Sequence, residues 1–292
     1  MNVVSRFFSL AVALSSSSVI AASEVGWWQV LPQWPIAQPL QQIDQRLLQG
    51  WRQLQCNRVD ATQLWLPAEA AQLGQLIAAF AEWPQQPLAP FASCFQLRLY
   101  QANQVTCRLV GERQRLQCDL PLLPQQLQQA HIVYATGGIA SAVGDYQINL
   151  PITASLNLLG HELAHWLGLA DEYQLSDGIA ADFCAGNYDH PALNVVVTDT
   201  ATLTSKELQQ LWHRLPWQFA VADWRQLGQL IEADTWRLGS RAEQVGLHAI
   251  DSCISTGKFA WRPVASMTAM QYIDISIWPE LYLQLIERQL RR

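Results

Sequence analysis

The chain has 292 residues, which is enough for one large domain or two of modest size. Half of the residues are hydrophobic and only 14% are charged, so a large core is easily filled. The net charge of -6 argues against nucleic acid, or an anionic membrane surface, as a partner.

Residues 1–23 have the features of a signal peptide. Arg6 gives a small positive region, FFSLAVAL and SSSSVI follow as a short apolar stretch, and residues 21–23 are small enough for a cleavage site. The apolar run is too short to span a membrane, and no later run reaches about 18 uninterrupted apolar residues. We therefore expect an exported protein, periplasmic or secreted, without stable membrane insertion; its oligomeric state stays open.

The six cysteines contain no CxxC pair, so a cysteine zinc site is not expected. An even number of cysteines in an exported chain favours disulfides. The segment QVTCRLVGERQRLQCDL predicts a hairpin with a turn at 111–114, in which Cys107 lies opposite Cys118. The remaining cysteines are expected to pair within their own regions, as Cys56–Cys94 and Cys184–Cys253.

Residues 24–125 differ from the rest of the chain in their pattern of predicted elements. Their pattern predicts helices at about 40–54 and 68–83 and then a hairpin at 94–120, with proline-rich joints between them. We expect a small N-terminal α/β region, either a pro-region or an accessory domain, packed on a larger part at 126–292.

The larger part is expected to hold a long helix, ITASLNLLGHELAHWLG, at 152–168. Its leucines fall three and four residues apart, which places them on one buried stripe. Thr153 is the expected N-cap, and Gly168 is a natural stop. Between about 178 and 258 we expect loops and helices. The other predicted elements are strands at 130–136 and 145–151 and helices at 205–215 and 279–292.

The predicted helix at 152–168 carries the pattern H-E-x-x-H. His161 and His165 are four residues apart, so they project from the same face and can bind one ion. Glu162 reaches the same side, where it can act as general base on a water bound to that ion. This combination is the chemistry of zinc peptidases, and we prefer it to two packed histidines.

The third ligand must come from beyond the helix. Gly168 allows a sharp turn, so that the residue three positions later can return to the metal. That residue is Asp171, whose carboxylate is an acceptable zinc ligand, and the neighbouring Glu172 is the alternative. The other histidines lack ligand spacing and are expected to be packed or at the surface: His131, His190, His213 and His248.

The metzincin-type zinc peptidases have the pattern H-E-x-x-H-x-x-G-x-x-H, whose last histidine is the third ligand. HELAHWLGLADEY resembles those members of the group that have aspartate at this position. It is more similar to the bacterial IgA-peptidase-type metallopeptidase family, in which H-E-x-x-H is followed by L-A-D-E-Y. HIVYATGGI, NVVVTD and GKFAWRPVASMTAM resemble further segments of that family, so the similarity covers roughly 130–285. It implies a metzincin-like α/β (α+β) fold with an active-site helix and a methionine turn.

The same resemblance implies further site residues. TAMQY is similar to the Ser-x-Met-x-Tyr form of the methionine turn, which assigns Met270, with Met267 as the alternative. Tyr272 would then help to hold the oxyanion. Arg262 would either bind a substrate carboxylate or carbonyl or form a structural ion pair.

The sequence therefore predicts an exported zinc metalloendopeptidase that hydrolyses peptide bonds in a protein or peptide substrate. Zn2+ would be held by His161, His165 and Asp171, with Glu162 as the catalytic base. One alternative is a non-catalytic envelope binding or scaffold module with a structural zinc, against which the intact Glu162 argues. Another is a zinc amidase that acts on cell-wall peptides.

Overall fold

The computed structural model describes residues 58, 61–121, 129–144, 146–187 and 192–291. These residues form a mixed α/β fold, which confirms the predicted class at that level. Four predicted features lie outside the described residues: the signal peptide, the helix at 40–54, Cys56 and His190.

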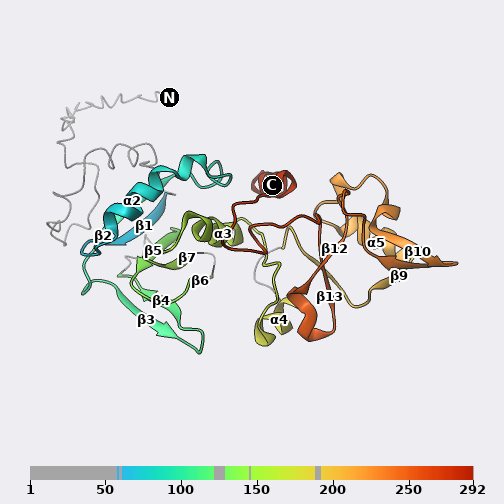
Figure 1. The fold of residues 1–292 in the computed structure, drawn as a ribbon, viewed down its shortest axis with the longest axis horizontal. Coiled ribbons are helices and arrows are strands. Elements are labelled where there is room, and N and C mark those ends of the chain that lie inside the picture. The colour runs from blue at the N-terminus through green and yellow to red at the C-terminus, as the bar shows by residue number, and fades with distance from the viewer. Residues whose placement is uncertain (1–57, 59–60, 122–128, 145, 188–191, 292) are drawn as a thin grey trace, which may run out of the picture.

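A five-stranded sheet organises the first half of the structure (Figure 1). Its order is β2-β1-β5-β7-β6, and all neighbours are parallel except β6, which runs antiparallel to β7 at one edge. Strands β5 and β7 confirm those predicted at 130–136 and 145–151, and the sheet takes strands from both sides of residue 125. The bounds are β1 (Thr62–Pro67), β2 (Phe95–Tyr100), β5 (His131–Ala135), β6 (Ser141–Val143) and β7 (Gln147–Pro151).

Both faces of this sheet are covered, because successive side chains of a strand point to opposite faces. Leu64 packs in one core with residues of helices α2 (Leu73–Ala81) and α3 (Leu156–Trp166). Trp65, the next residue, packs in a second core with the hairpin of β3 (Thr106–Val110) and β4 (Arg115–Asp119). Helix α2 is shorter than the predicted 68–83, since turns precede it and a 3-10 turn, η2 (Trp83–Gln85), follows it.

Two predicted disulfides are confirmed. Cys107 lies opposite Cys118 in the β3–β4 hairpin and is bonded to it. Cys184 is bonded to Cys253, which joins helix α4 (Asp177–Cys184) to the 3-10 helix η6 (Asp251–Thr256). These bonds indicate an oxidising environment.

The Cys184–Cys253 bond is expected to stabilise the fold more than the hairpin bond. It closes a loop with a sequence separation of 69, against 11 for Cys107–Cys118. Loop-closure entropy then predicts a loss of about 4 kcal/mol when both Cys184 and Cys253 are replaced by serine, and about 3 kcal/mol for the hairpin pair. Denaturant unfolding of the two double variants measures this difference. Equal losses would show that chain entropy does not set the stabilities.

The second half of the structure holds two small three-stranded sheets, where only loops and helices had been predicted between 178 and 258. That prediction was wrong because these strands have three to five residues and are mostly exposed or half-buried, so they lack a strong alternating pattern. One sheet has the order β12-β13-β8 and the other β10-β11-β9. The bounds are β8 (Val196–Thr198), β9 (Thr202–Thr204), β10 (Gly228–Glu232), β11 (Thr235–Leu238), β12 (His248–Ile250) and β13 (Phe259–Arg262).

Two helices of the second half agree with the predicted 205–215 and 279–292. Helix α5 (Ser205–Arg214) begins with a capping box between Thr204 and Glu207. Helix α6 (Glu280–Leu290) buries Leu281, Tyr282, Leu285 and Ile286. Two short 3-10 helices, η4 (Gln218–Ala220) and η5 (Trp224–Leu227), follow α5.

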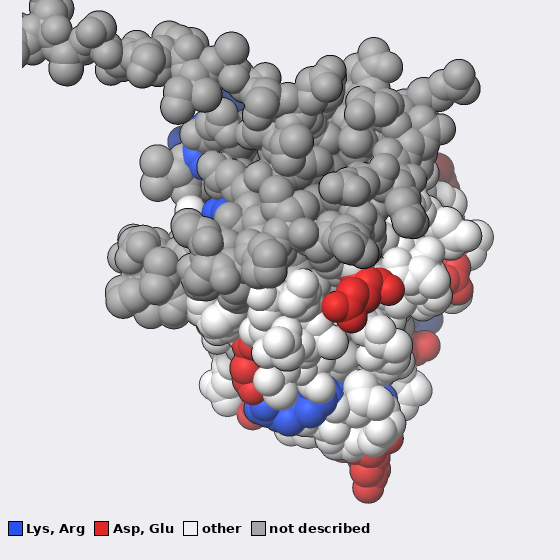
Figure 2. Space-filling model, turned by 90° about the vertical axis from the view of Figure 1, so that its left-hand side faces the viewer, with Lys and Arg blue, Asp and Glu red and all other residues white. Residues whose placement is uncertain are grey.

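On the face shown in Figure 2, the described atoms are mostly uncharged, with scattered acidic and basic side chains. Within the described ranges, every helix is too short or too polar to cross a membrane.

Candidate metal centre

Helix α3 positions the two histidines of the motif. Its N-cap is Ser155, whose hydroxyl accepts a hydrogen bond from the amide of Leu158 at 3.2 Å. The predicted cap, Thr153, was wrong, because a turn from Pro151 to Ala154 intervenes before the helix begins. The His161 and His165 rings lie on one face, 4.9 Å apart.

The helix ends in a turn that returns the chain to the histidines. Gly168 has φ +92°, in the left-handed region that glycine adopts without strain. Its amide donates to the carbonyl of His165 at 2.9 Å, and the amide of Leu169 donates to Ala164 at 2.9 Å. Residues 167–173 are called the ligand loop below, since they carry Asp171 back toward the helix.

The structure brings together the three predicted ligands. Oδ1 of Asp171 lies 3.1 Å from Nε2 of His161 and 3.2 Å from Nε2 of His165. The ligand atoms of the three residues lie within 4.8 Å of one another, so the group could hold one metal ion. His161 is almost fully buried, and His165 and Asp171 are partly exposed, which leaves an approach from solvent.

Hydrogen bonds on the far side of each ring orient both imidazoles. Nδ1 of His161 lies 2.9 Å from the carbonyl oxygen of Ala269, and Nδ1 of His165 lies 2.9 Å from that of Leu169. A carbonyl only accepts, so each Nδ1 must donate. In the neutral imidazole this leaves the lone pair on Nε2, as in metal-ligating histidines.

The three residues fit a divalent cation. Oδ1 of Asp171 is buried without a hydrogen-bond donor, and the two Nε2 lone pairs face the same point. Three converging acceptors repel one another unless a cation or a proton lies between them. Two imidazoles and one carboxylate suit catalytic zinc with an open position, and also suit other divalent transition metals.

A proton is the competitor for this position. Burial lowers the pKa of His165, but the carboxylates of Asp171 and Glu162 outweigh that effect and raise the pKa to about 9. Burial likewise opposes ionisation of Asp171, yet His165 and His161 hold its pKa well below the usual range. The site therefore favours a positive charge.

Glu162 faces the same site from helix α3. Burial raises its pKa, and the charges that His165 and His161 can carry offset part of that shift. A carboxylate beside a metal position with a raised pKa is a suitable general base.

Two neighbours of the site were not predicted. The ring of Tyr173 stacks on His161, with centroids 6.2 Å apart and an interplanar angle of 20°. Burial, followed by the charge of Asp171, raises the pKa of Tyr173. The charge of Arg115, at the start of β4, is a small influence that offsets part of the rise in the pKa of Glu162 and of Tyr173. Tyr173 could have been found from its place in the motif, but Arg115 lies in a distant hairpin.

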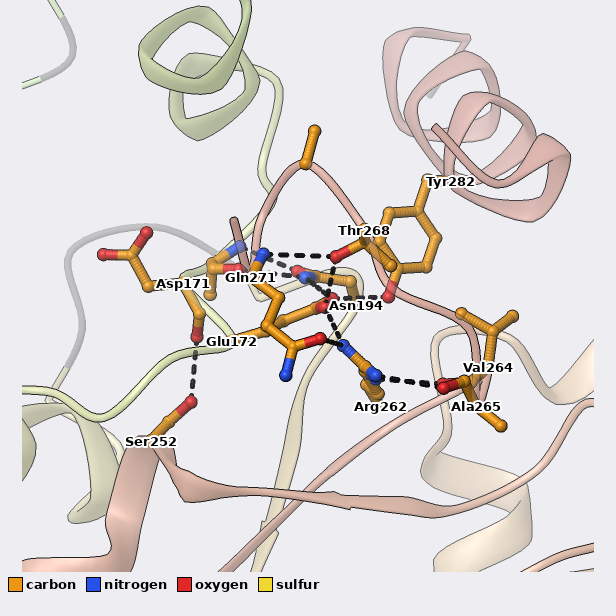
Figure 3. Close-up of polar contacts among 12 residues, drawn as sticks. Asp171, Glu172, Asn194, Ser252, Arg262, Val264, Ala265, Thr268, Gln271 and Tyr282 are labelled. Carbon is orange, nitrogen blue, oxygen red and sulfur yellow. Dashed lines mark hydrogen bonds and ion pairs between the residues drawn. The ribbon is translucent and has the colours of Figure 1, made fainter. Parts of the chain in front are cut away.

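Glu172, the alternative ligand, is occupied by protein donors. Its two carboxylate oxygens accept hydrogen bonds from four side chains (Figure 3). One of these is Arg262, at 2.9 Å, so this arginine makes the structural ion pair that had been one of its two predicted roles. Asp171 is left as the carboxylate beside the histidines.

The segment predicted to form a methionine turn lies next to His161 in the structure. Met270 is fully buried, whereas the alternative Met267 is 56% exposed. The carbonyl of Ala269, next to Met270, is the one that accepts from His161. Tyr272, two residues after Met270, is half-exposed.

Three other histidines take the packed or surface roles expected of them. His131 is buried, and its Nδ1 accepts a hydrogen bond from the indole N–H of Trp65 at 3.1 Å. Nε2 of His248 lies 3.0 Å from the carbonyl oxygen of Gln244. His213 lies beside Trp212 at the surface of α5. None of these belongs to the metal-ligand group found among the described residues.

A scan against protein-family models and a search of curated proteins gave no match to this chain. Function is therefore inferred from the motif residues and from the geometry of the site.

Proposed function

We propose that this protein is an exported zinc metallopeptidase. The observation that carries the proposal is the convergence of Nε2 of His161 and Nε2 of His165 on Oδ1 of Asp171. Zinc in this position would supply Lewis acidity, which activates water and polarises a peptide carbonyl. The disulfides support export, and the predicted signal peptide would direct it.

Glu162 supplies the proton transfers. It takes the proton from the attacking water and passes it to the leaving amine of the scissile bond. Burial raises its pKa above the ordinary glutamate range, which strengthens it as a proton acceptor. The oxyanion role of Tyr272 stays a prediction.

The geometry favours a catalytic site over a structural zinc site. Structural zinc has four protein ligands, whereas the group found among the described residues has three. A site with these three protein ligands would offer its fourth position to water and substrate, with Glu162 beside it. A scaffold module has no need of a base there.

Metal analysis tests the proposal most directly. The purified mature protein is expected to hold one zinc per chain, because three ligands converge on one point. Removal of the metal with a chelator should abolish peptide cleavage and lower the melting temperature, and added zinc should restore both. Absence of stoichiometric metal from protein prepared without chelators would contradict the proposal.

Digestion of a broad peptide library and of purified peptidoglycan identifies the substrate class. Cleavage of library peptides is the expected result. Release of cell-wall peptides alone would show an amidase that uses the same metal and base.

A further inference from the structure

A buried network of side chains surrounds Glu172, one residue after the proposed ligand Asp171. Oε1 of Glu172 accepts from Nδ2 of Asn194 at 2.7 Å and from the hydroxyl of Tyr282. Oε2 accepts from Nη1 of Arg262 at 2.9 Å and from the hydroxyl of Thr268 at 2.5 Å. The Glu172 network consists of these residues, and Glu172 itself is 1% exposed (Figure 3).

The donors come from four separate parts of the chain. Asn194 precedes β8, Arg262 ends β13, Thr268 opens the methionine turn and Tyr282 lies in α6. The guanidinium of Arg262 donates three further hydrogen bonds: to the side chain of Gln271 at 2.7 Å and to the carbonyls of Val264 at 3.0 Å and Ala265 at 3.2 Å. The network therefore fastens the ligand loop to the second half of the structure.

The network also fixes the backbone on both sides of Asp171. Asn194 brackets Ala170, accepting from its amide at 2.7 Å and donating to its carbonyl at 2.9 Å. The amide of Glu172 donates to the carbonyl of Met270 at 3.0 Å. The carbonyl of Asp171 itself accepts from the hydroxyl of Ser252 at 3.0 Å, beside the disulfide-bonded Cys253.

The same turn that contacts Glu172 also orients His161. The hydroxyl of Thr268 donates a hydrogen bond to the Glu172 carboxylate, and the carbonyl of Met270 accepts one from the Glu172 amide. The carbonyl of Ala269, between them, accepts a hydrogen bond from Nδ1 of His161. Two of the three proposed ligands are thus held against one short segment of chain. A shift of this segment would move the imidazole and the carboxylate relative to each other.

A buried ion pair is a costly way to hold a fold together. Well-packed apolar residues in its place are often as stable or more stable, because both charges must leave water. Here each carboxylate oxygen of Glu172 accepts two hydrogen bonds, which together fix one position of the ligand loop. We propose that Glu172 is a positioning residue of the metal centre, which holds Asp171 and the Ala269 carbonyl behind His161 in one rigid frame. This rests on the proposed metal site.

Removal of one hydroxyl from the network tests the inference. Tyr282→Phe is expected to weaken zinc binding about tenfold or more, as loss of partners behind metal ligands does. The matched control is Tyr100→Phe, which removes a buried hydroxyl that donates to the Tyr134 carbonyl at 2.6 Å, on β2 at the far edge of the main sheet. Both variants should lower the melting temperature of the metal-free protein by about 2–4 °C.

Zinc dissociation constants from chelator competition, and the visible absorption spectrum of the cobalt(II)-loaded protein, provide the readouts. Only Tyr282→Phe should change them. Wild-type affinity and spectrum in Tyr282→Phe would overturn the inference and leave a purely structural network. If that variant does not fold, Thr268→Val removes another donor and is judged by the same criterion. Failure of the wild type to bind zinc would instead overturn the proposed function.

Discussion

Glu162→Gln is expected to keep the metal and to reduce peptide hydrolysis by about 10²- to 10⁴-fold, the usual contribution of a general base. Glutamine has nearly the same shape as glutamate but cannot accept the proton of the attacking water. Both histidines are oriented by hydrogen bonds to backbone carbonyls, so we expect the substitution to leave the rings in place. The measurement is kcat/KM on a peptide that the wild type cleaves, together with zinc content.

Glu232→Gln is the matched control for this experiment. Glu232 is an exposed residue of β10, in a sheet separate from the one that precedes helix α3. The control should cleave peptide at the wild-type rate. A Glu162→Gln enzyme that retains full activity would remove Glu162 from the mechanism, and one that loses its zinc would show that the side chain supports the metal instead.

The proposed ligands and base were accessible to sequence reasoning because their relations are local. His161, Glu162 and His165 share one helical face. The helix ends at Trp166, and Gly168, the predicted stop, follows it in the left-handed conformation. The beginning of the helix was harder to predict. Thr153 and Ser155 both offer a hydroxyl, and only the turn that follows β7 decides between them.

The choice between Asp171 and Glu172 depends on contacts that are distant in sequence. The residues are adjacent carboxylates, and their spacing from His165 differs by one position. What distinguishes them is that the donors to Glu172 are 22 to 110 positions away. Arg115 was missed for the same reason, since its charge influences Glu162 and Tyr173 only through the tertiary fold. Short, exposed strands such as β9 and β10 left no pattern to detect.

Asp171→Asn is expected to impair mainly metal binding, and Glu172→Gln mainly folding. Asp171→Asn removes a charged ligand, so zinc affinity should fall by more than the roughly 10- to 100-fold that loss of a partner behind a ligand produces. Glu172→Gln leaves Arg262 without its buried counter-charge. The free energy of unfolding of the metal-free protein should then fall by about 3–5 kcal/mol, while zinc binding weakens only about 10- to 100-fold.

The pH of the unfolding measurement decides how cleanly these effects separate. The pKa of His165 is raised to about 9 in the folded metal-free protein, above its ordinary 6.5. Its ion pair with Asp171 therefore contributes fully below about pH 6.5 and is lost as the pH rises through about 9. At about pH 9.5, Asp171→Asn should unfold like the metal-free wild type, whereas Glu172→Gln should not. The outcome that would contradict the proposed site concerns zinc binding. If Glu172→Gln abolishes zinc binding and Asp171→Asn retains it, Glu172 is the ligand and the proposed site is wrong.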